Sequence, residues 1–213
     1  PTSRAAMIGP SPDPTPRAPS SAPRPASPAS KATFAVGAGI VSQLAVLASS
    51  AFDAGDAGRG ALLGARGVGS GLGPIIAARL VGRDRPKLLR VCGLAGLGFS
   101  VAYLLAGLSP ALWVACICVA LAHLGGGAQW TLSTMGLQME SPDELRGRII
   151  AGDFALVTLM LGVTSALAGA VSEAIGVRPT VVVFSAMAAT ASCTYLAATS
   201  RLRRRLRTEQ QPR

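Results

Sequence analysis

Arg66 is the most informative candidate functional residue of this chain, because it interrupts a long run of small and apolar residues between positions 61 and 81. If that run crosses a membrane, a charged side chain within it is costly and should face the bundle interior or a water-filled cavity. Two interpretations stay open. Arg66 contacts an anionic substrate or a gating ion pair, or its long side chain snorkels to the outer membrane surface.

A second group of polar side chains follows one later apolar run. Gln129 and Ser133 are four residues apart and share a helix face, and His123 and Trp130, seven apart, roughly do so too. These residues predict either a substrate-lining stripe or hydrogen bonds between helices. Gln43, in the first apolar run, allows the same two interpretations.

Asp153 lies one to two turns into another apolar run and could carry a proton or pair with an interior cation. A carboxylate near the first turn of a helix, favoured by the helix dipole, is the simpler interpretation. Arg66 is expected near the outer end of its run and Asp153 near the inner end of its own. A direct pair between them is therefore not expected.

Signatures of soluble enzymes are missing from the sequence. The glycines between positions 67 and 73 lack the G-x-G-x-x-G spacing, and no P-loop or G-x-S-x-G motif occurs. His123 is the single histidine, so paired histidine ligands for a metal cannot form. We expect no enzyme activity, no metal site and no cofactor.

The composition indicates which class of fold must position these residues. Only 14% of the 213 residues are charged, against about 25% in soluble domains. The formal net charge of +10 does not indicate nucleic acid, because Lys and Arg lie between the apolar runs and at the two ends rather than on one polar surface. The pattern predicts an all-α membrane protein.

Six apolar runs are each about long enough to cross a bilayer as a helix. A Pro/Ala/Ser-rich segment at 1–31 precedes them and is expected to be disordered, and a basic cytoplasmic tail at 201–213 follows them. The bundle is thus expected at 32–200, with spans at 32–52, 61–81, 88–108, 111–135, 149–171 and 180–199.

The basic residues predict the orientation. All of the 20 Lys and Arg residues except Arg59, Arg66 and Arg178 fall in the terminal segments or in the second and fourth loops with their flanks. Six spans place those segments on one side, which the positive-inside rule assigns to the cytoplasm. We expect a multi-pass protein of the plasma (inner) membrane with both termini in the cytoplasm.

Glycine spacing suggests close helix packing in the second span. Small residues four apart let helix backbones approach each other in lipid, and Pro74 can kink the helix. Close packing is one interpretation and a helix that bends or slides is the other. The pairs are Gly60 and Gly64, Gly67 and Gly71, and Gly69 and Gly73.

Three stretches carry a family resemblance: 58–90, 121–138 and 141–159. Together they resemble the C-terminal half of major facilitator superfamily transporters, with the drug and siderophore exporter branch, driven by proton antiport, as the closest match. The resemblance implies a bundle of repeats that binds a small molecule at mid-membrane between two halves. It also implies that a cytoplasmic loop acts as a conformational latch, formed by Gly82, Arg83, Asp84 and Arg85. The simpler interpretation of this loop is that its basic residues only anchor the topology.

The chain departs from that family in length. Members have twelve spans and this chain has about six, so we expect a C-terminal half or fragment. Its candidate partners are a small-molecule substrate, the lipid bilayer and a matching N-terminal six-helix half. The alternative is a membrane remnant or packing subunit that does not transport.

Overall fold

A computed structural model of the protein describes residues 27–82 and 84–210. The predicted disordered tail at 1–31 lies outside the described residues up to position 26, and so does Arg83 of the predicted latch. Disorder was the wrong prediction for residues 27–31, which form the start of the first helix. Within the described ranges all long elements are helices. In chain order they are α1 (Ser27–Ser42), α2 (Leu44–Val46), the π-helix η1 (Leu47–Ala51), α3 (Gly55–Val81), α4 (Arg85–Leu108), α5 (Leu112–Glu140), α6 (Arg146–Ile175), α7 (Val177–Ala198) and α8 (Ser200–Gln210).

The six predicted spans are confirmed, since six helical segments of the described chain are long and apolar enough to cross a membrane. Several of them extend beyond the apolar runs that predicted them. The polar stretch at 53–60 is largely helical because α3 begins at Gly55, and α6 begins at Arg146. A helix satisfies its own backbone hydrogen bonds, so it can continue from the hydrocarbon into the polar zone without losing them.

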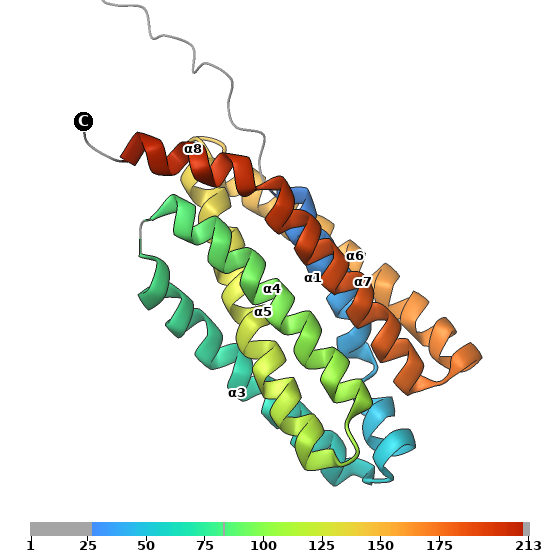
Figure 1. Cartoon of the computed structure of the whole chain (residues 1–213). Helices are drawn as coiled ribbons and strands as arrows, with labels where there is room; N and C mark the ends of the chain where they lie inside the picture. Colours follow the sequence, from blue (N-terminus) through green and yellow to red (C-terminus); the bar gives the residue numbers. More distant parts are fainter. Residues whose placement is uncertain (1–26, 83, 211–213) are drawn as a thin grey trace, which may run out of the picture.

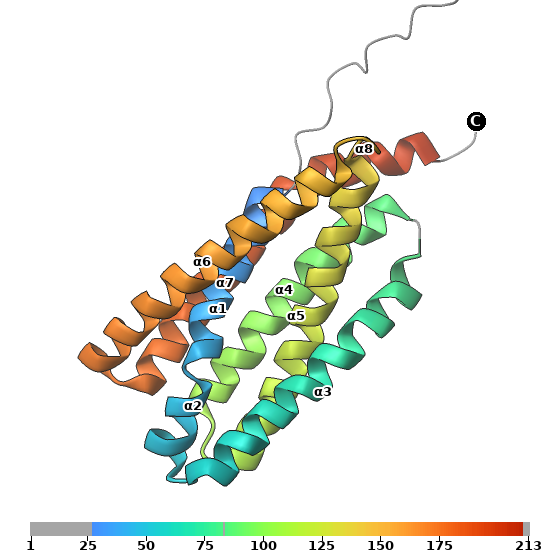
Figure 2. The same cartoon turned by 180° about the vertical axis from the view of Figure 1, so that it is seen from behind.

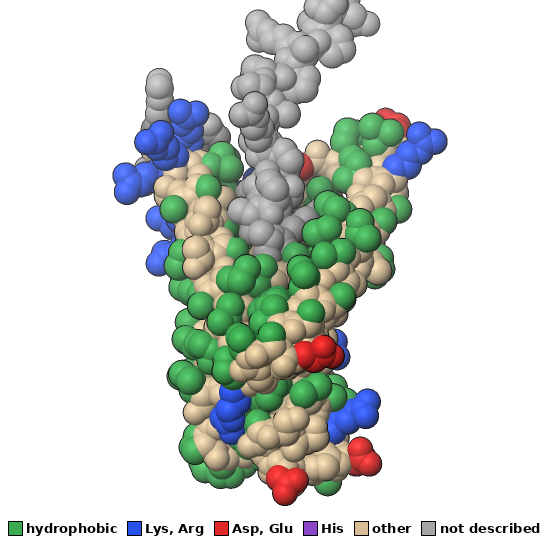
Figure 3. All heavy atoms as spheres, turned by 90° about the vertical axis from the view of Figure 1, so that its right-hand side faces the viewer, with side chains coloured by type: hydrophobic (Ala, Val, Ile, Leu, Met, Phe, Trp, Pro, Cys, Tyr) green, Lys and Arg blue, Asp and Glu red, His purple; other side chains and the backbone are tan. Residues whose placement is uncertain are grey.

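The helices form an open bundle in which α5 and α7 are the main packing partners. Helix α5 packs on α3 and α4, while α7 packs on α4 and α1, and α1 also packs on α6. The start of α1 and helix α8 lie at the same end of the bundle (Figures 1 and 2). Charged side chains gather toward the two ends, and hydrophobic ones dominate the middle (Figure 3). This distribution fits a bilayer-spanning body.

Two glycines of α3 allow the close contact with α5. A Cβ added at Gly69 would clash with the carbonyl oxygen of Ala120, and one at Gly73 would clash with that of Leu124. Close packing is therefore realised for the Gly69 and Gly73 pair. The other predicted pairs differ, because a Cβ would meet nothing within 4 Å at Gly60, Gly64, Gly67 and Gly71.

The first span is broken near its middle, at Gln43. The Gln43 amide donates to the Ile40 carbonyl at 3.0 Å, a contact three residues back rather than four, and the Ser42 hydroxyl donates to the Gly39 carbonyl at 2.8 Å. The π-helix η1 follows within a few residues. Side-chain bonds to the preceding turn and π-turns both bend helices, so this span changes direction next to the cavity described below.

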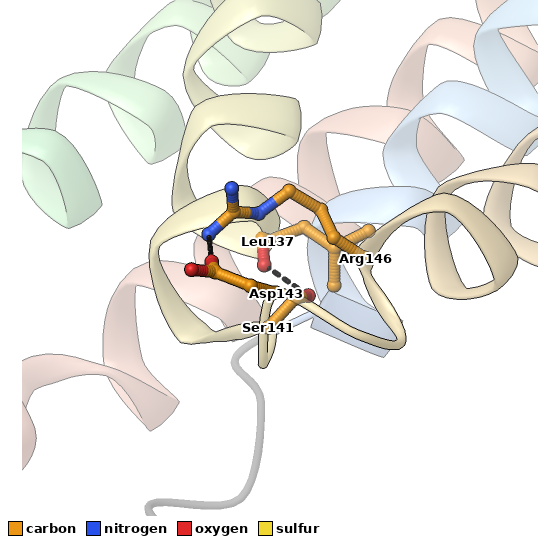
Figure 4. A network of polar contacts seen from close by, with 4 residues as sticks. All are labelled: Leu137, Ser141, Asp143 and Arg146. Carbon is orange, nitrogen blue, oxygen red and sulfur yellow. Dashed lines mark hydrogen bonds and ion pairs between the residues drawn. The ribbon is translucent and has the colours of Figure 1, made fainter.

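The connection between α5 and α6 is held by short-range polar contacts (Figure 4). The Ser141 hydroxyl donates to the Leu137 carbonyl at 2.6 Å, which satisfies an acceptor at the end of α5. Arg146 forms an ion pair with Asp143 across the turn. The turn therefore closes within a few residues and brings α6 back along the bundle.

At the opposite end Arg178 ties three segments together. Its guanidinium donates to the carbonyls of Gly107 at 3.1 Å, Ser109 at 2.7 Å and Ala51 at 3.3 Å. The same group lies 4.8 Å from the centre of the Phe52 ring, within cation–π range. Arg178 thus joins the start of α7 to the end of η1 and to the α4–α5 connection.

Candidate functional site

A cavity of about 400 Å³ lies between α1, α3, α4, α5 and α6. Pockets that bind small molecules usually have volumes of a few hundred Å³, with apolar walls and a few convergent polar groups. This cavity has that character. The described residues that line it include Thr33, Phe34, Arg66, Ser70, Phe99, His123, Gln129, Trp130 and Ser165.

His123 is a polar group of the cavity that hydrogen bonds to two other helices hold in place. Its Nε2 lies 2.7 Å from the Tyr103 hydroxyl, and its Nδ1 lies 3.1 Å from the Ser70 hydroxyl. A neutral imidazole carries one donor and one acceptor nitrogen, and a hydroxyl can play either role. Both neutral tautomers can therefore keep two hydrogen bonds, and the ring is fixed between α3 and α4.

The bonds of His123 lie against an aromatic wall. Phe99 makes edge-to-face contacts with the rings of Tyr103, at 4.8 Å between centroids, and of His123, at 5.8 Å. Tyr103 is completely buried, and among the described residues its hydroxyl is bonded to His123. This packing limits the motion of the imidazole.

Arg66 lines the same cavity at greater depth than the sequence indicated. Because α3 begins at Gly55, Arg66 lies about 16 Å along the helix and close to its midpoint. Its side chain is exposed, and no hydrogen bond or ion pair joins it to another described residue.

Trp130 and Phe34 supply a second aromatic surface. Their rings meet edge to face with centroids 5.0 Å apart, and Phe154 of α6 approaches Trp130 at 6.0 Å. Trp130 and Phe34 both line the cavity. Helices α1, α5 and α6 therefore meet through aromatic rings at this wall.

The structure brings together part of the predicted site. Arg66, His123, Gln129 and Trp130 line one cavity. Gln43, Ser133 and Asp153 are not among the described lining residues. The carboxyl group of Asp153 lies on α6, and the Ser133 hydroxyl donates to the Trp130 carbonyl of its own helix at 2.9 Å. Gln43 is buried at the break in the first span.

Sequence reasoning missed Ser70, Thr33, Phe34 and Ser165, which also line the cavity. Ser70 had a detectable signal, because it follows Arg66 by four residues and therefore shares its helix face. The other three come from helices that are far from Arg66 in the chain. Their convergence depends on tertiary packing alone.

The residues of the predicted latch loop other than Arg83 hold the ends of three helices. Gly82 ends α3 with a φ of 55°, in the left-handed region that glycine adopts readily. The Asp84 side chain accepts a bond from the Lys87 amide at 3.0 Å and so caps α4. Arg85 forms an ion pair with Glu140 of α5 at 3.2 Å. The loop therefore joins the ends of α3, α4 and α5.

The match to a family model decides what kind of protein carries this site. Residues 30–213 match the model described as Major Facilitator Superfamily. The chain belongs to the Major Facilitator Superfamily. Members of this superfamily are secondary transporters rather than enzymes, which fits an apolar cavity with a few polar groups inside a bundle of membrane-spanning helices. Comparison with curated proteins and with solved structures gave no match.

Proposed function

We propose that the chain is the C-terminal half of a superfamily exporter that moves a small molecule out of the cell by proton antiport. The cavity between α1, α3, α4, α5 and α6 supports this proposal, because its polar groups lie at mid-helix depth in an apolar bundle. Transporters of this type bind their substrate near the bilayer midplane. Arg66, His123, Gln129 and Trp130 would contact the substrate.

Transport also needs a surface that alternately opens to each side. In this proposal the six described spans rock against a matching N-terminal half, and the cavity forms one side of the shared site. The Arg85–Glu140 pair would act as a latch at the cytoplasmic face. Because both side chains are half exposed, this pair contributes little stability and can break at low cost.

Proton coupling needs an ionisable group that changes its protonation state between the two orientations. Asp153, seven residues after the first residue of α6, is the carboxylate we assign to this role. It is partly buried, and α6 packs on α1, which contributes to the cavity. In this proposal a change at Asp153 reaches the cavity through α1.

The orientation is part of the proposal. We place both termini and the loop at 82–87 in the cytoplasm of the plasma (inner) membrane, following the positive-inside rule. A protein without its four native cysteines, carrying Asp84→Cys, should react with an impermeant maleimide in inside-out vesicles and not in intact cells. Labelling of intact cells would contradict the orientation.

Transport is tested by coexpressing the chain with an N-terminal six-helix half and measuring efflux of a compound panel. Efflux should require both halves and a proton gradient, and Asp153→Asn should abolish the gradient dependence. If Arg66→Ala and His123→Ala leave efflux unchanged, the proposed site is wrong. If no half supports efflux although both are correctly inserted, the alternative of a packing subunit or remnant is favoured.

A further inference from the structure

The described lining of the cavity is uncharged except at one position. Arg66 is the one charged side chain among the described residues that line it, and no carboxylate of that set faces it. Arg66 lies about halfway along a membrane-spanning helix. A cation at this depth is stabilised when an anion binds to it.

The remaining walls are suited to an apolar and aromatic body. Trp130, Phe34 and Phe99 line the cavity, and the first two meet edge to face at 5.0 Å. Aromatic rings contribute large apolar area and prefer edge-to-face or offset contact with other rings. An aromatic ligand would thus extend a cluster that is already present.

His123 is poorly placed to be the primary anion contact. Both of its ring nitrogens already have hydroxyl partners, Tyr103 and Ser70. Ser70 lies one helical turn from Arg66 and also lines the cavity. A hydroxyl oxygen has capacity for a further hydrogen bond, so Ser70 can add a second polar contact beside the guanidinium.

We propose that this cavity selects small aromatic anions of the carboxylate class, held by Arg66 through a paired hydrogen bond and by the Trp130 and Phe34 rings through aromatic contact. The inference rests on the proposed function, whose substrate class it names. A guanidinium donates two parallel hydrogen bonds to a carboxylate, which gives both charge compensation and geometry. Neutral and cationic molecules of the same shape should bind more weakly.

The two tryptophans of the chain allow a direct binding assay. Trp113 is 68% exposed near the start of α5, whereas Trp130 lines the cavity, so Trp113→Phe leaves a single reporter at the site. The full chain is placed in nanodiscs of phosphatidylcholine and titrated with 4-bromobenzoate, whose bromine quenches a contacting indole. The neutral 4-bromobenzamide and the cationic 4-bromobenzylammonium are matched probes.

The carboxylate should quench Trp130 saturably, and the amide and ammonium probes should need about tenfold higher concentration or more, as expected for loss of a charged hydrogen bond. Arg66→Gln should weaken carboxylate binding to the same extent. Arg66→Lys should restore part of it. Arg59→Gln, an exposed change on the same helix, should have no effect.

The headgroup of an anionic lipid is the competing occupant of the site. Nanodiscs that also contain phosphatidylglycerol separate the two: unchanged affinity for 4-bromobenzoate supports the proposal, and competition by the lipid would overturn it. Equal quenching by all three probes, or unchanged quenching in a folded Arg66→Gln protein, would overturn the proposal. Because binding is measured without flux, anion binding without transport would refute the proposed function alone, and transport restricted to cations would refute this inference alone.

Discussion

The hydroxyl of Tyr103 on α4 lies 2.7 Å from Nε2 of His123 on α5, and no surface of Tyr103 reaches solvent. The pair therefore joins two helices through a hydrogen bond that water does not compete for. The imidazole that it fixes forms part of the cavity wall. Removing either partner leaves a buried polar group without its bond.

Replacing Tyr103 by Phe should both destabilise the bundle and weaken binding in the cavity. The expected loss of unfolding free energy is about 1 kcal/mol, the scale for one hydrogen bond inside a membrane protein. Thermal unfolding in detergent and quenching of Trp130 by 4-bromobenzoate measure the two effects. Tyr195→Phe, which removes another buried hydroxyl on α7 away from the cavity, should lower stability and leave binding unchanged.

Gly69 and Gly73 of α3 should tolerate no side chain, whereas Gly67 and Gly71 of the same helix should accept one. Gly69→Ala places a methyl group against the Ala120 carbonyl and should cost about 1–3 kcal/mol, as overpacking does. Gly71→Ala points into open space and should be neutral or stabilising by less than about 1 kcal/mol. Unfolding midpoints in detergent compare them, and equal midpoints would contradict the α3–α5 contact.

Arg178→Gln should loosen the end of the bundle opposite the termini. The substitution removes donors to three backbone carbonyls and the cation–π contact with Phe52. Loss of this group should cost about 1–3 kcal/mol, the range for hydrogen bonds to a charged group. Arg59→Gln is the control, because Arg59 is an exposed arginine without a hydrogen bond or ion pair to any described residue. Unfolding midpoints in detergent measure the difference, and equal midpoints for the two variants would show that the Arg178 contacts contribute nothing to stability.

The latch is tested by exchanging the charges of Arg85 and Glu140. Each single reversal, Arg85→Glu or Glu140→Arg, should slow efflux in the coexpression assay, because it places like charges in the positions of an ion pair whose atoms lie 3.2 Å apart. The double exchange should restore most of the rate. Stability should change by less than about 1 kcal/mol throughout, because the pair is half exposed. Full efflux in both single variants would contradict the latch role and would show that the loop only anchors the topology.

The sequence by itself determined that the apolar runs of this protein lie in lipid and how many spans they form. In lipid, the backbone N–H and C=O groups of a run of about 20 apolar residues find hydrogen-bond partners within the run only if it forms a helix. This requirement is local to each run. Glycine spacing also indicated where α3 could approach another helix, but not which pair would do so. Gly69 and Gly73 meet α5, whereas Gly60, Gly64, Gly67 and Gly71 face open space.

Tertiary structure alone decided which polar residues share a site. Arg66 and His123 are both visible in the sequence, but Tyr103 gave no signal, since its partner lies on the next helix. Helix periodicity fixes which residues of one helix share a face, while the contact between faces depends on rotation and crossing angle. Those quantities are set by packing of side chains distant in the chain. Thr33, Phe34 and Ser165 therefore joined the cavity only when the helices assembled.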